Sequence, residues 1–307
     1  MDVVPFEPAA IARYPTLASW DADASTIVAT MLARWHLTPG TAFVGGISGA
    51  VLAVETADGS PAILKVGYPH SEAIWEAVGL ASFPPGTAPR ILDQDAWTWS
   101  MLLEPIVPGL PLAQAPLSAS EALRIGGTLQ ARLSEGSIPA GVPTLSTAMG
   151  TYVTRARERL PGQLPALRAM GVADLVRDAI DTLESLAASR VDLRLIHGDF
   201  NPGNILQGDG DRWFAVDPKP LAGDPAFDLW PLVSQTGHPF ESHDPAGVLA
   251  EHLRLACSAA GVDNDRAANW SYARAGLNVS WYLADGAPAQ AAQESVALRA
   301  WAIVAGR

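Results

Sequence analysis

The sequence is poor in the features that mark secreted, nucleic-acid-binding and cysteine-rich metal proteins. It holds 1 cysteine, Cys257, in 307 residues, so neither a disulfide within the chain nor a cysteine-rich metal site can form. Basic residues are also few: 20 Lys and Arg stand against 32 Asp and Glu, and the formal net charge is −12. A nucleic-acid binder needs a basic face that displaces counterions from phosphate. We therefore expect no nucleic-acid partner, and a reducing cytoplasm suits the single thiol.

A long hydrophobic run is missing as well. The longest uncharged stretch, residues 35–54, contains Pro39 and four glycines, which break it as a membrane helix. The first residues lack the basic segment and the apolar stretch of a signal peptide. These absences predict a cytoplasmic protein with no membrane partner.

Residues that build a core are plentiful. Hydrophobic residues make up 49% of the chain and charged residues 17%, the opposite of a disordered composition. The length suggests two lobes or domains. The acidic balance is compatible with a cationic small ligand, although most acidic proteins are merely soluble. The composition leaves the oligomeric state open, and we expect a monomer.

The chain divides into a strand-rich first part and a helical second part. A Pro-rich, uncharged segment at residues 105–116 separates them and can serve as a hinge. We therefore expect an α+β, bilobal fold, with an antiparallel-sheet lobe over residues 1–105 and a mainly helical lobe over 106–307. The first lobe is predicted to contain a helix over 24–35 with Asp23 as its N-cap, a helix over 71–83, and strands over 42–44, 50–54, 62–66, 90–92 and 98–103. The second is predicted to contain helices over 119–134, 147–159 and 172–189, a hairpin between 194 and 216, and helices from 245 onward.

The strongest chemical signal is an H-x-D-x-x-x-x-N pattern formed by His197, Asp199 and Asn204, with apolar residues on both sides. The pattern suits phosphoryl transfer. In that chemistry a carboxylate accepts the proton of the attacking hydroxyl, and an amide five residues later reaches a phosphate-bound metal. A polar loop around a core histidine is the alternative.

A second carboxylate follows the next apolar strand. Residues 213–216 read as a buried strand that ends at Asp217, and a Gly-Asp-Gly turn at 208–210 separates this strand from Asn204. A hairpin would bring Asn204 and Asp217 together, and Mg²⁺ prefers such oxygen ligands. A structural salt bridge is the alternative for Asp217.

The first lobe offers groups that suit phosphate binding. The turn between two of its strands carries Gly45, Gly46, Ser48 and Gly49, whose backbone amides can approach phosphate oxygens without obstruction by Cβ atoms. A plain hairpin is the alternative, and no G-K-[ST] follows that would make a Walker loop.

Lys65 is the one charged residue of an apolar strand, and a buried lysine needs an anionic partner. Glu76 on the following helix is the first choice of partner, with Glu72 one turn earlier in reserve. In the functional interpretation the lysine binds nucleotide phosphates. An edge-strand lysine that points to solvent is the alternative.

From these residues the sequence resembles the protein-kinase-like antibiotic phosphotransferases, and within them the aminoglycoside/hydroxyurea antibiotic resistance kinase family. The motifs that carry the resemblance are His197-Gly198-Asp199 with Asn204, the run WFAVDPKPL at residues 213–221, and the run GDPAFDLWP at residues 223–231. The resemblance covers most of residues 40–290, with its specific motifs concentrated in residues 195–231.

The resemblance implies a protein-kinase-like fold and an ATP- and Mg²⁺-dependent transfer to a small molecule. Asp199 would be the catalytic base, and Asn204 and Asp217 the Mg²⁺ ligands. Asp228 would anchor the catalytic loop. The residues that would bind the nucleotide are Lys65, Glu76, Gly45, Gly46, Ser48, Gly49, Glu104 and Ile106, the last two through the hinge backbone.

The acceptor is less well determined by the sequence. Asn201 stands where the family pattern has a histidine, and Pro202-Gly203 is a different link from the expected one; both positions could border the acceptor. Asp285 is the residue that we select on the acceptor side.

The predicted activity is O-phosphorylation of a small molecule such as the aminoglycoside streptomycin, in antibiotic resistance or in metabolism. The alternatives are an amino sugar, hydroxyurea or another natural product as acceptor, or a non-catalytic nucleotide-binding module. A protein kinase is disfavoured, because no A-P-E segment follows Asp217.

Overall fold

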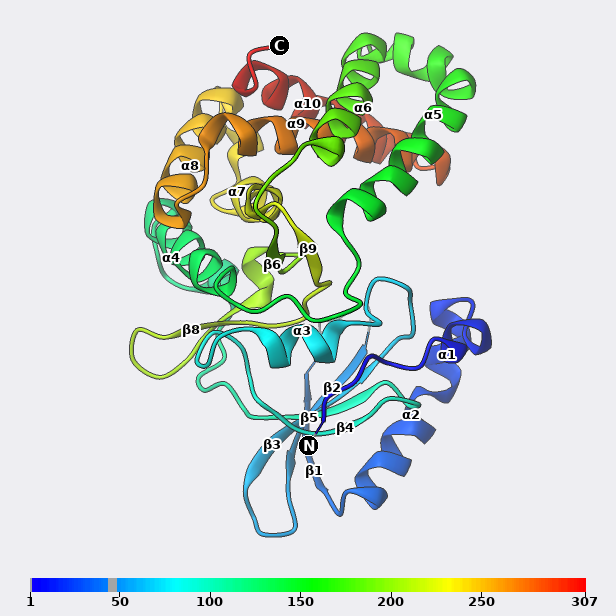
Figure 1. Ribbon diagram of the computed structural model, residues 1–307, viewed down its shortest axis with the longest axis vertical. Coiled ribbons are helices and arrows are strands. Elements are labelled where there is room, and N and C mark those ends of the chain that lie inside the picture. Colours follow the sequence, from blue (N-terminus) through cyan, green and yellow to red (C-terminus); the bar gives the residue numbers. More distant parts are fainter. Residues whose placement is uncertain (1, 44–48) are drawn as a thin grey trace. The chain divides into compact units, whose positions relative to one another are not determined.

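The computed structural model in Figure 1 describes residues 2–43 and 49–307. The chain forms two compact units. The first unit consists of Met1–Pro111 and Asn204–Pro220, and the second of Leu112–Gly203 and Leu221–Arg307. Gly45, Gly46 and Ser48, expected to cover a nucleotide, lie outside the described residues.

The first unit is built on a five-stranded antiparallel sheet with the strand order β1-β2-β3-β5-β4. The strands are β1 (Thr38–Phe43), β2 (Gly49–Glu55), β3 (Pro61–Gly67), β4 (Ile91–Asp95) and β5 (Ser100–Leu103). The helices of this unit are α1 (Ala9–Arg13), α2 (Leu17–Arg34) and α3 (Glu76–Ser82). The strands and helices predicted from the sequence for this unit are therefore present, with shifted ends.

The start of α2 differs from the prediction. The helix begins after Thr16, whose hydroxyl accepts the Ser19 amide while the Ser19 side chain accepts the Thr16 amide. This reciprocal pair satisfies two amides that the first turn leaves unbonded. Asp23 lies inside the helix and accepts a hydrogen bond from the Tyr14 hydroxyl at 3.0 Å, so the prediction of Asp23 as the N-cap was wrong.

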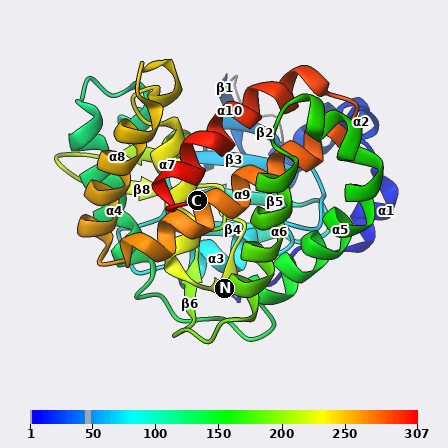
Figure 2. The same cartoon turned by 90° about the horizontal axis from the view of Figure 1, so that it is seen from above.

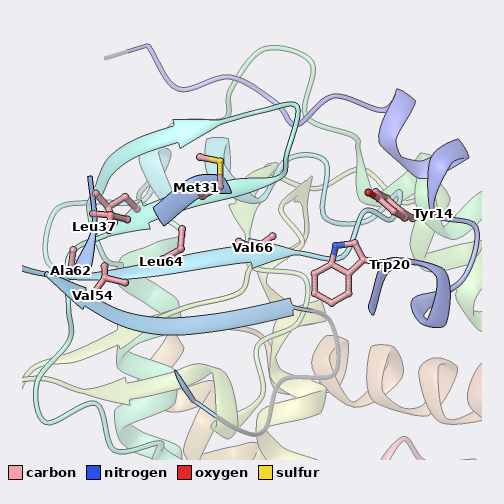
Figure 3. Close-up of a cluster of buried hydrophobic side chains, with 9 residues drawn as sticks. Tyr14, Trp20, Met31, Leu37, Val54, Ala62, Leu64 and Val66 are labelled. Carbon is pink, nitrogen blue, oxygen red and sulfur yellow. The ribbon is translucent and has the colours of Figure 1, made fainter. Parts of the chain in front are cut away.

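The hydrophobic core of the first unit lies between α2 and the sheet (Figure 3). Met31 of α2 and Leu64 and Val66 of β3 are fully buried there. Because side chains alternate along a strand, Lys65 lies on the opposite face of the sheet from these two neighbours. β3 pairs with β2 on one side and with β5 on the other. Lys65 is therefore on a central strand, and the edge-strand alternative was wrong.

A short hairpin of β7 (Ile205–Gln207) and β8 (Trp213–Ala215) belongs to the first unit. The Gln207 amide donates to the Leu110 carbonyl at 2.9 Å, and the Ala215 amide donates to the Thr87 carbonyl at 2.7 Å. The sequence boundary at residues 105 and 106 assigned this hairpin to the second lobe. The difference arises because these hydrogen bonds join segments about a hundred residues apart, which local patterns do not register.

The second unit is mainly helical. Its two short strands, β6 (Arg194–Ile196) and β9 (Leu221–Gly223), form an antiparallel pair. Figure 2 shows α9 running beside α10, and α9 also packs on α6. The helices are α4 (Ala119–Leu133), α5 (Leu145–Ala169), α6 (Ala173–Ala188), α7 (Leu229–Gln235), α8 (Pro245–Ala260), α9 (Asn264–Ala284) and α10 (Pro288–Val304).

α5 continues ten residues beyond its predicted end at residue 159, although Pro161 and Pro165 each remove a helical hydrogen-bond donor. Tertiary contacts hold the extension. Gln163 donates to the Ser280 carbonyl and accepts from the Ser280 hydroxyl, both at 2.8 Å, and Leu167 is fully buried. No helix in the described part of the chain is long and apolar enough to cross a membrane.

Replacing Gly276 in α9 by alanine is expected to destabilise the protein. The new Cβ would overlap the Cβ of Ala179 in α6, and overpacking of this kind costs about 1–3 kcal/mol. The matched control is Gly150→Ala in α5, where nothing lies within 4 Å of a new Cβ and alanine gains about 0.5–1 kcal/mol. Urea denaturation measures both changes, and equal stability of the two variants would contradict the close approach of α9 and α6.

Candidate active site

The first unit holds a buried ammonium group between two carboxylates. Nζ of Lys65 lies 2.5 Å from Oε1 of Glu76 and 2.8 Å from Oδ1 of Asp217. The side chains of Lys65 and Glu76 are 13% and 4% exposed, whereas that of Asp217 is 37% exposed. The predicted pairing of Lys65 with Glu76 is therefore present. For Asp217 the sequence offered proximity to Asn204, with a structural salt bridge as the alternative. The structure contains such a salt bridge, to Lys65, a partner that the sequence analysis did not name.

Burial and charge oppose each other in this cluster. Burial alone lowers the pKa of Lys65, but Glu76 and Asp217 outweigh it and raise that pKa above its ordinary value. Burial also raises the pKa of Glu76, to about 7, although Lys65 lowers it. Lys65 is thus a permanent cation, of the kind that can bind phosphate.

Asn204 and Asp217 lie at the open end of the β7–β8 hairpin. The Val216 amide donates to the Asn204 carbonyl at 2.9 Å, so the residue next to Asp217 is bonded directly to Asn204. The predicted proximity of these two residues is therefore present. Asp217 has a φ of +59°, a left-handed conformation that aspartate tolerates better than most residues.

These two side chains have the chemistry of a Mg²⁺ site. They offer an amide oxygen and a carboxylate, and Mg²⁺ in nucleotide sites takes one or two such protein ligands and fills its shell with phosphates and water. Within residues 2–43 and 49–307, no group of three or more His, Cys, Asp or Glu side chains is arranged to hold a metal ion by itself. A metal at this hairpin would therefore depend on the phosphates.

The segment after β5 has the backbone groups of a hinge. The Glu104 amide donates to the Arg90 carbonyl at 2.9 Å, and Pro105 has no amide hydrogen. In the segment Glu104-Pro105-Ile106, the backbone groups that could bind a nucleotide base are therefore the Glu104 carbonyl and the Ile106 amide. The Glu104 side chain forms an exposed ion pair with Arg90, with Oε2 2.9 Å from Nε, so it has a structural partner besides any role in binding.

Gly49 is the described member of the predicted glycine-rich turn. It opens β2 opposite Gly67 of β3. A Cβ at this position would lie 2.9 Å from the Val66 carbonyl oxygen, closer than real Cβ atoms come. Glycine is therefore needed here for the close pairing of β2 with β3, whatever the turn binds.

In the second unit, the loop that carries Asp199 is anchored by Asp228. The His197 amide donates to Oδ2 of Asp228 at 2.7 Å, and the Gly198 amide donates to Oδ1 at 2.8 Å. Asp228 is 1% exposed. Burial raises its pKa to about 6, although the two amides lower it. The anchoring role that the resemblance implied for Asp228 thus has a direct geometric basis.

Asp199 itself is held by its own loop. Its amide donates to Nδ1 of the buried His197 at 3.3 Å, and the Asn201 side chain donates to Oδ1 of Asp199 at 3.3 Å. Asn201 also accepts the Gly203 amide at 2.9 Å. The two departures from the family pattern, Asn201 and Pro202-Gly203, therefore form a local turn that contacts Asp199.

Asp285 lies apart from these contacts. It is exposed and forms the C-terminal cap of α9, where its amide donates to the Trp281 carbonyl at 2.9 Å. This position at the end of α9 is explained by helix capping alone. Its role toward an acceptor remains a prediction.

Removing the cation from the first cluster should have a pH-dependent cost. Lys65→Met leaves Glu76 buried without its cation, and breaking a buried pair in this way costs about 3–5 kcal/mol. The pKa of Glu76 then rises further, so the folded state binds a proton that the unfolded state releases, and stability falls as the pH rises. We expect a larger loss of unfolding free energy at about pH 8 than at about pH 5.

Arg254→Met is the control, because Nη2 of Arg254 lies 2.6 Å from an exposed Glu251 carboxylate and neither residue touches the cluster. Such surface pairs contribute about 0–1 kcal/mol. Urea denaturation of both variants at the two pH values measures the difference. A loss in Lys65→Met that is small and independent of pH would contradict the buried ion pair.

Solved structures of other kinases have the same fold. A choline/ethanolamine kinase family protein from Mesorhizobium loti superposes with a TM-score of 0.60 at 19% identity, over 95% of this chain and 100% of that one. A spectinomycin phosphotransferase, solved with ADP and spectinomycin, gives 0.57 at 12% identity over 92% and 93%. These likenesses confirm the α+β, protein-kinase-like fold expected from the sequence.

Sequence comparison identifies nearer relatives. The chain is 32% identical to a streptomycin 6-kinase of Streptomyces glaucescens over 272 residues, which are 88% of this chain and 87% of the relative. It is 32% identical to a hydroxyurea phosphotransferase of Kitasatospora aureofaciens over 260 residues, 84% and 73% of the two chains. Residues 34–286 match the model of one family. The chain therefore belongs to the aminoglycoside/hydroxyurea antibiotic resistance kinase family.

Proposed function

We propose that this protein is an ATP- and Mg²⁺-dependent O-phosphotransferase that acts on a hydroxyl group of a small molecule, with an aminoglycoside such as streptomycin as the first candidate. The observation that carries the proposal is the cluster of the buried Lys65 and Glu76 with the partly exposed Asp217, at the hairpin end that also holds Asn204. Family membership and the streptomycin 6-kinase relative support it.

Lys65 would bind the phosphates of ATP as a point charge. Its partner Glu76 holds the ammonium group at a distance of 2.5 Å and is itself buried in α3, so the cation has little freedom to move. Asn204 and Asp217 would hold Mg²⁺, which when bound supplies charge neutralisation on the phosphoryl oxygens. The partial exposure of Asp217 leaves its carboxylate accessible to a ligand.

Asp199 would accept the proton of the acceptor hydroxyl during in-line transfer of the γ-phosphoryl group. Catalysis of this kind is mostly positioning and electrostatic stabilisation. The Asn201 side chain orients Asp199 through its hydrogen bond to Oδ1. The anchored amides of His197 and Gly198 hold the preceding backbone.

The nucleotide base would pair with the hinge backbone, through the Glu104 carbonyl and the Ile106 amide. The turn of Gly45, Gly46, Ser48 and Gly49 would cover the phosphates through its amides. The acidic net charge of −12 favours a cationic acceptor, and the exposed Asp285 is our candidate contact for it. ATP as the donor accords with a cytoplasmic location.

The test is an ADP-release assay with MgATP against streptomycin, other aminoglycosides, hydroxyurea and an amino sugar. We expect transfer to one acceptor class, and Asp199→Asn should lower kcat by about 10²- to 10⁴-fold because it removes the general base. Asp181→Asn is the matched control, since Asp181 forms an exposed ion pair with Arg157.

Each outcome of this assay has a clear meaning. Transfer to streptomycin supports the named acceptor, and transfer to hydroxyurea or an amino sugar alone would correct the acceptor and keep the reaction. MgATP binding without transfer to any acceptor would favour a non-catalytic nucleotide-binding module. Full activity in Asp199→Asn would remove Asp199 from the role of base.

The Mg²⁺ requirement provides a separate prediction. Asp217→Asn should raise the Mg²⁺ concentration needed for half-maximal activity by about tenfold or more, because a carboxylate ligand is lost. Asp209→Asn on the same hairpin is the control, since Asp209 is exposed and pairs with Arg212. A Mg²⁺ titration of the two variants measures the shift, and an unchanged requirement in Asp217→Asn would exclude it as a ligand.

A further inference from the structure

One face of α9 presents three polar or aromatic side chains to a single short segment of the second unit. Arg266, Trp270 and Arg274 follow one another at intervals of four residues and therefore lie along one side of the helix. Arg266 Nε and Trp270 Nε1 both donate to Oδ2 of Asp224, the latter at 2.7 Å. Asp224 caps the short 3-10 helix η3 (Pro225–Asp228) through the Ala226 amide.

Arg274 approaches the other end of η3. Its guanidinium lies over two aromatic rings, with Cζ 4.2 Å from the ring centre of Phe227 and 4.6 Å from that of Trp230. Stacking on two rings restricts the planar guanidinium to one position. The edge of the Trp270 ring also packs on Phe227, at 5.3 Å between ring centres. The charge of Arg274 therefore lies in a fixed position beside η3, the helix that Asp228 ends.

We infer that Arg274 is a positioning residue for the catalytic loop: it keeps the buried Asp228 carboxylate ionised, so that Asp228 holds the His197 and Gly198 amides and, through them, Asp199. The inference rests on the proposed function, in which Asp199 is the base. It adds a residue on α9 that lies 46 positions beyond Asp228 and outside every motif of the loop.

The ionised form of Asp228 is favoured by its hydrogen bonds. Each of its two oxygens accepts one backbone amide, and an ionised carboxylate is the form that accepts at both oxygens without donating. A proton on either oxygen would add a donor to a group that faces two donors. One amide would then lose a full-strength partner in a buried site, which is costly.

The position of Arg274 over Phe227 and Trp230, which flank Asp228 in the chain, assigns this role to its charge. Burial raises the pKa of Asp228, and the two amides and Arg274 lower it. Arg274 on α9 lowers the pKa of Asp228, and Asp199 in the loop raises it. The His197 imidazole accepts the Asp199 amide at Nδ1. Loss of Arg274 would therefore leave more of Asp228 protonated near neutral pH.

The test compares Arg274→Met, Arg274→Lys and Arg266→Met by the pH dependence of kcat. In Arg274→Met the acid limb should move upward by about 1–2 pH units, and activity should return at high pH, where Asp228 ionises without help. Arg274→Lys keeps the charge and should restore the wild-type limb. Arg266→Met removes an arginine from the same helix face and should leave the limb in place.

A second readout needs no activity. The pKa of Asp228 is raised in the folded state, and further so without Arg274, so the unfolding free energy of Arg274→Met relative to wild type should fall as the pH rises from about 5 to about 8. This change should be absent in Arg274→Lys, which keeps the positive charge. If no acceptor is found, the stability profile still tests the coupling of Arg274 to Asp228, and the proposed function fails separately.

Two results would overturn the inference. The first is an Arg274→Met variant whose activity is reduced by the same factor at every pH, since that would indicate lost packing on Phe227 and Trp230 alone. The second is an Arg274→Met stability deficit that does not change between about pH 5 and about pH 8. Either result would leave Asp199 and the reaction as proposed.

Discussion

A charge can be buried in a protein only where other charges or dipoles balance it, and this constraint organises both units of the chain. In the first unit Lys65 lies on the inner strand of a sheet, on the face opposite Leu64 and Val66, and its ammonium group needs two carboxylates. One comes from the start of α3 and one from the end of the β7–β8 hairpin. The ion pairs of Lys65 Nζ therefore fix the positions of the sheet, α3 and the β7–β8 hairpin relative to one another.

In the second unit the buried charge is negative, and positive groups and backbone amides balance it. Asp228 is a buried carboxylate that accepts two backbone amides, and the charge of Arg274 lowers its pKa. Asp224, four residues earlier, is balanced by Arg266 and Trp270 of the same helix. The loop of Asp199 has little regular structure of its own, so the carboxylate of Asp228, and not a helix or strand, holds its backbone. A functional loop supported in this way depends on charge states as well as on packing.

Local patterns predicted most elements of the fold because each depends on neighbours in the sequence. The strand of Lys65 alternates in burial over residues 61–66, and α4 begins after Ser118, which forms a capping box with Glu121. Two helix ends were predicted wrongly, because other contacts outweighed the local signal. Asp23 is a good capping residue, but Thr16 with Ser19 forms the complete box seven residues earlier. Pro161 should end a helix, but the contacts of Gln163 and Leu167 continue α5 past it.

The sequence by itself determined the chemistry of the candidate site: the spacing of His197, Asp199 and Asn204, the lysine in an apolar strand, and the carboxylate after the next strand are all short-range patterns. Tertiary structure decided which of these groups meet. Lys65 and Asp217 are 152 residues apart, and the position of Arg274 over Phe227, next to Asp228 in the chain, depends on how α9 packs on η3. Spacing encodes what a side chain can do, whereas the distance between two buried charges follows from the packing of whole elements, which no local window of sequence contains.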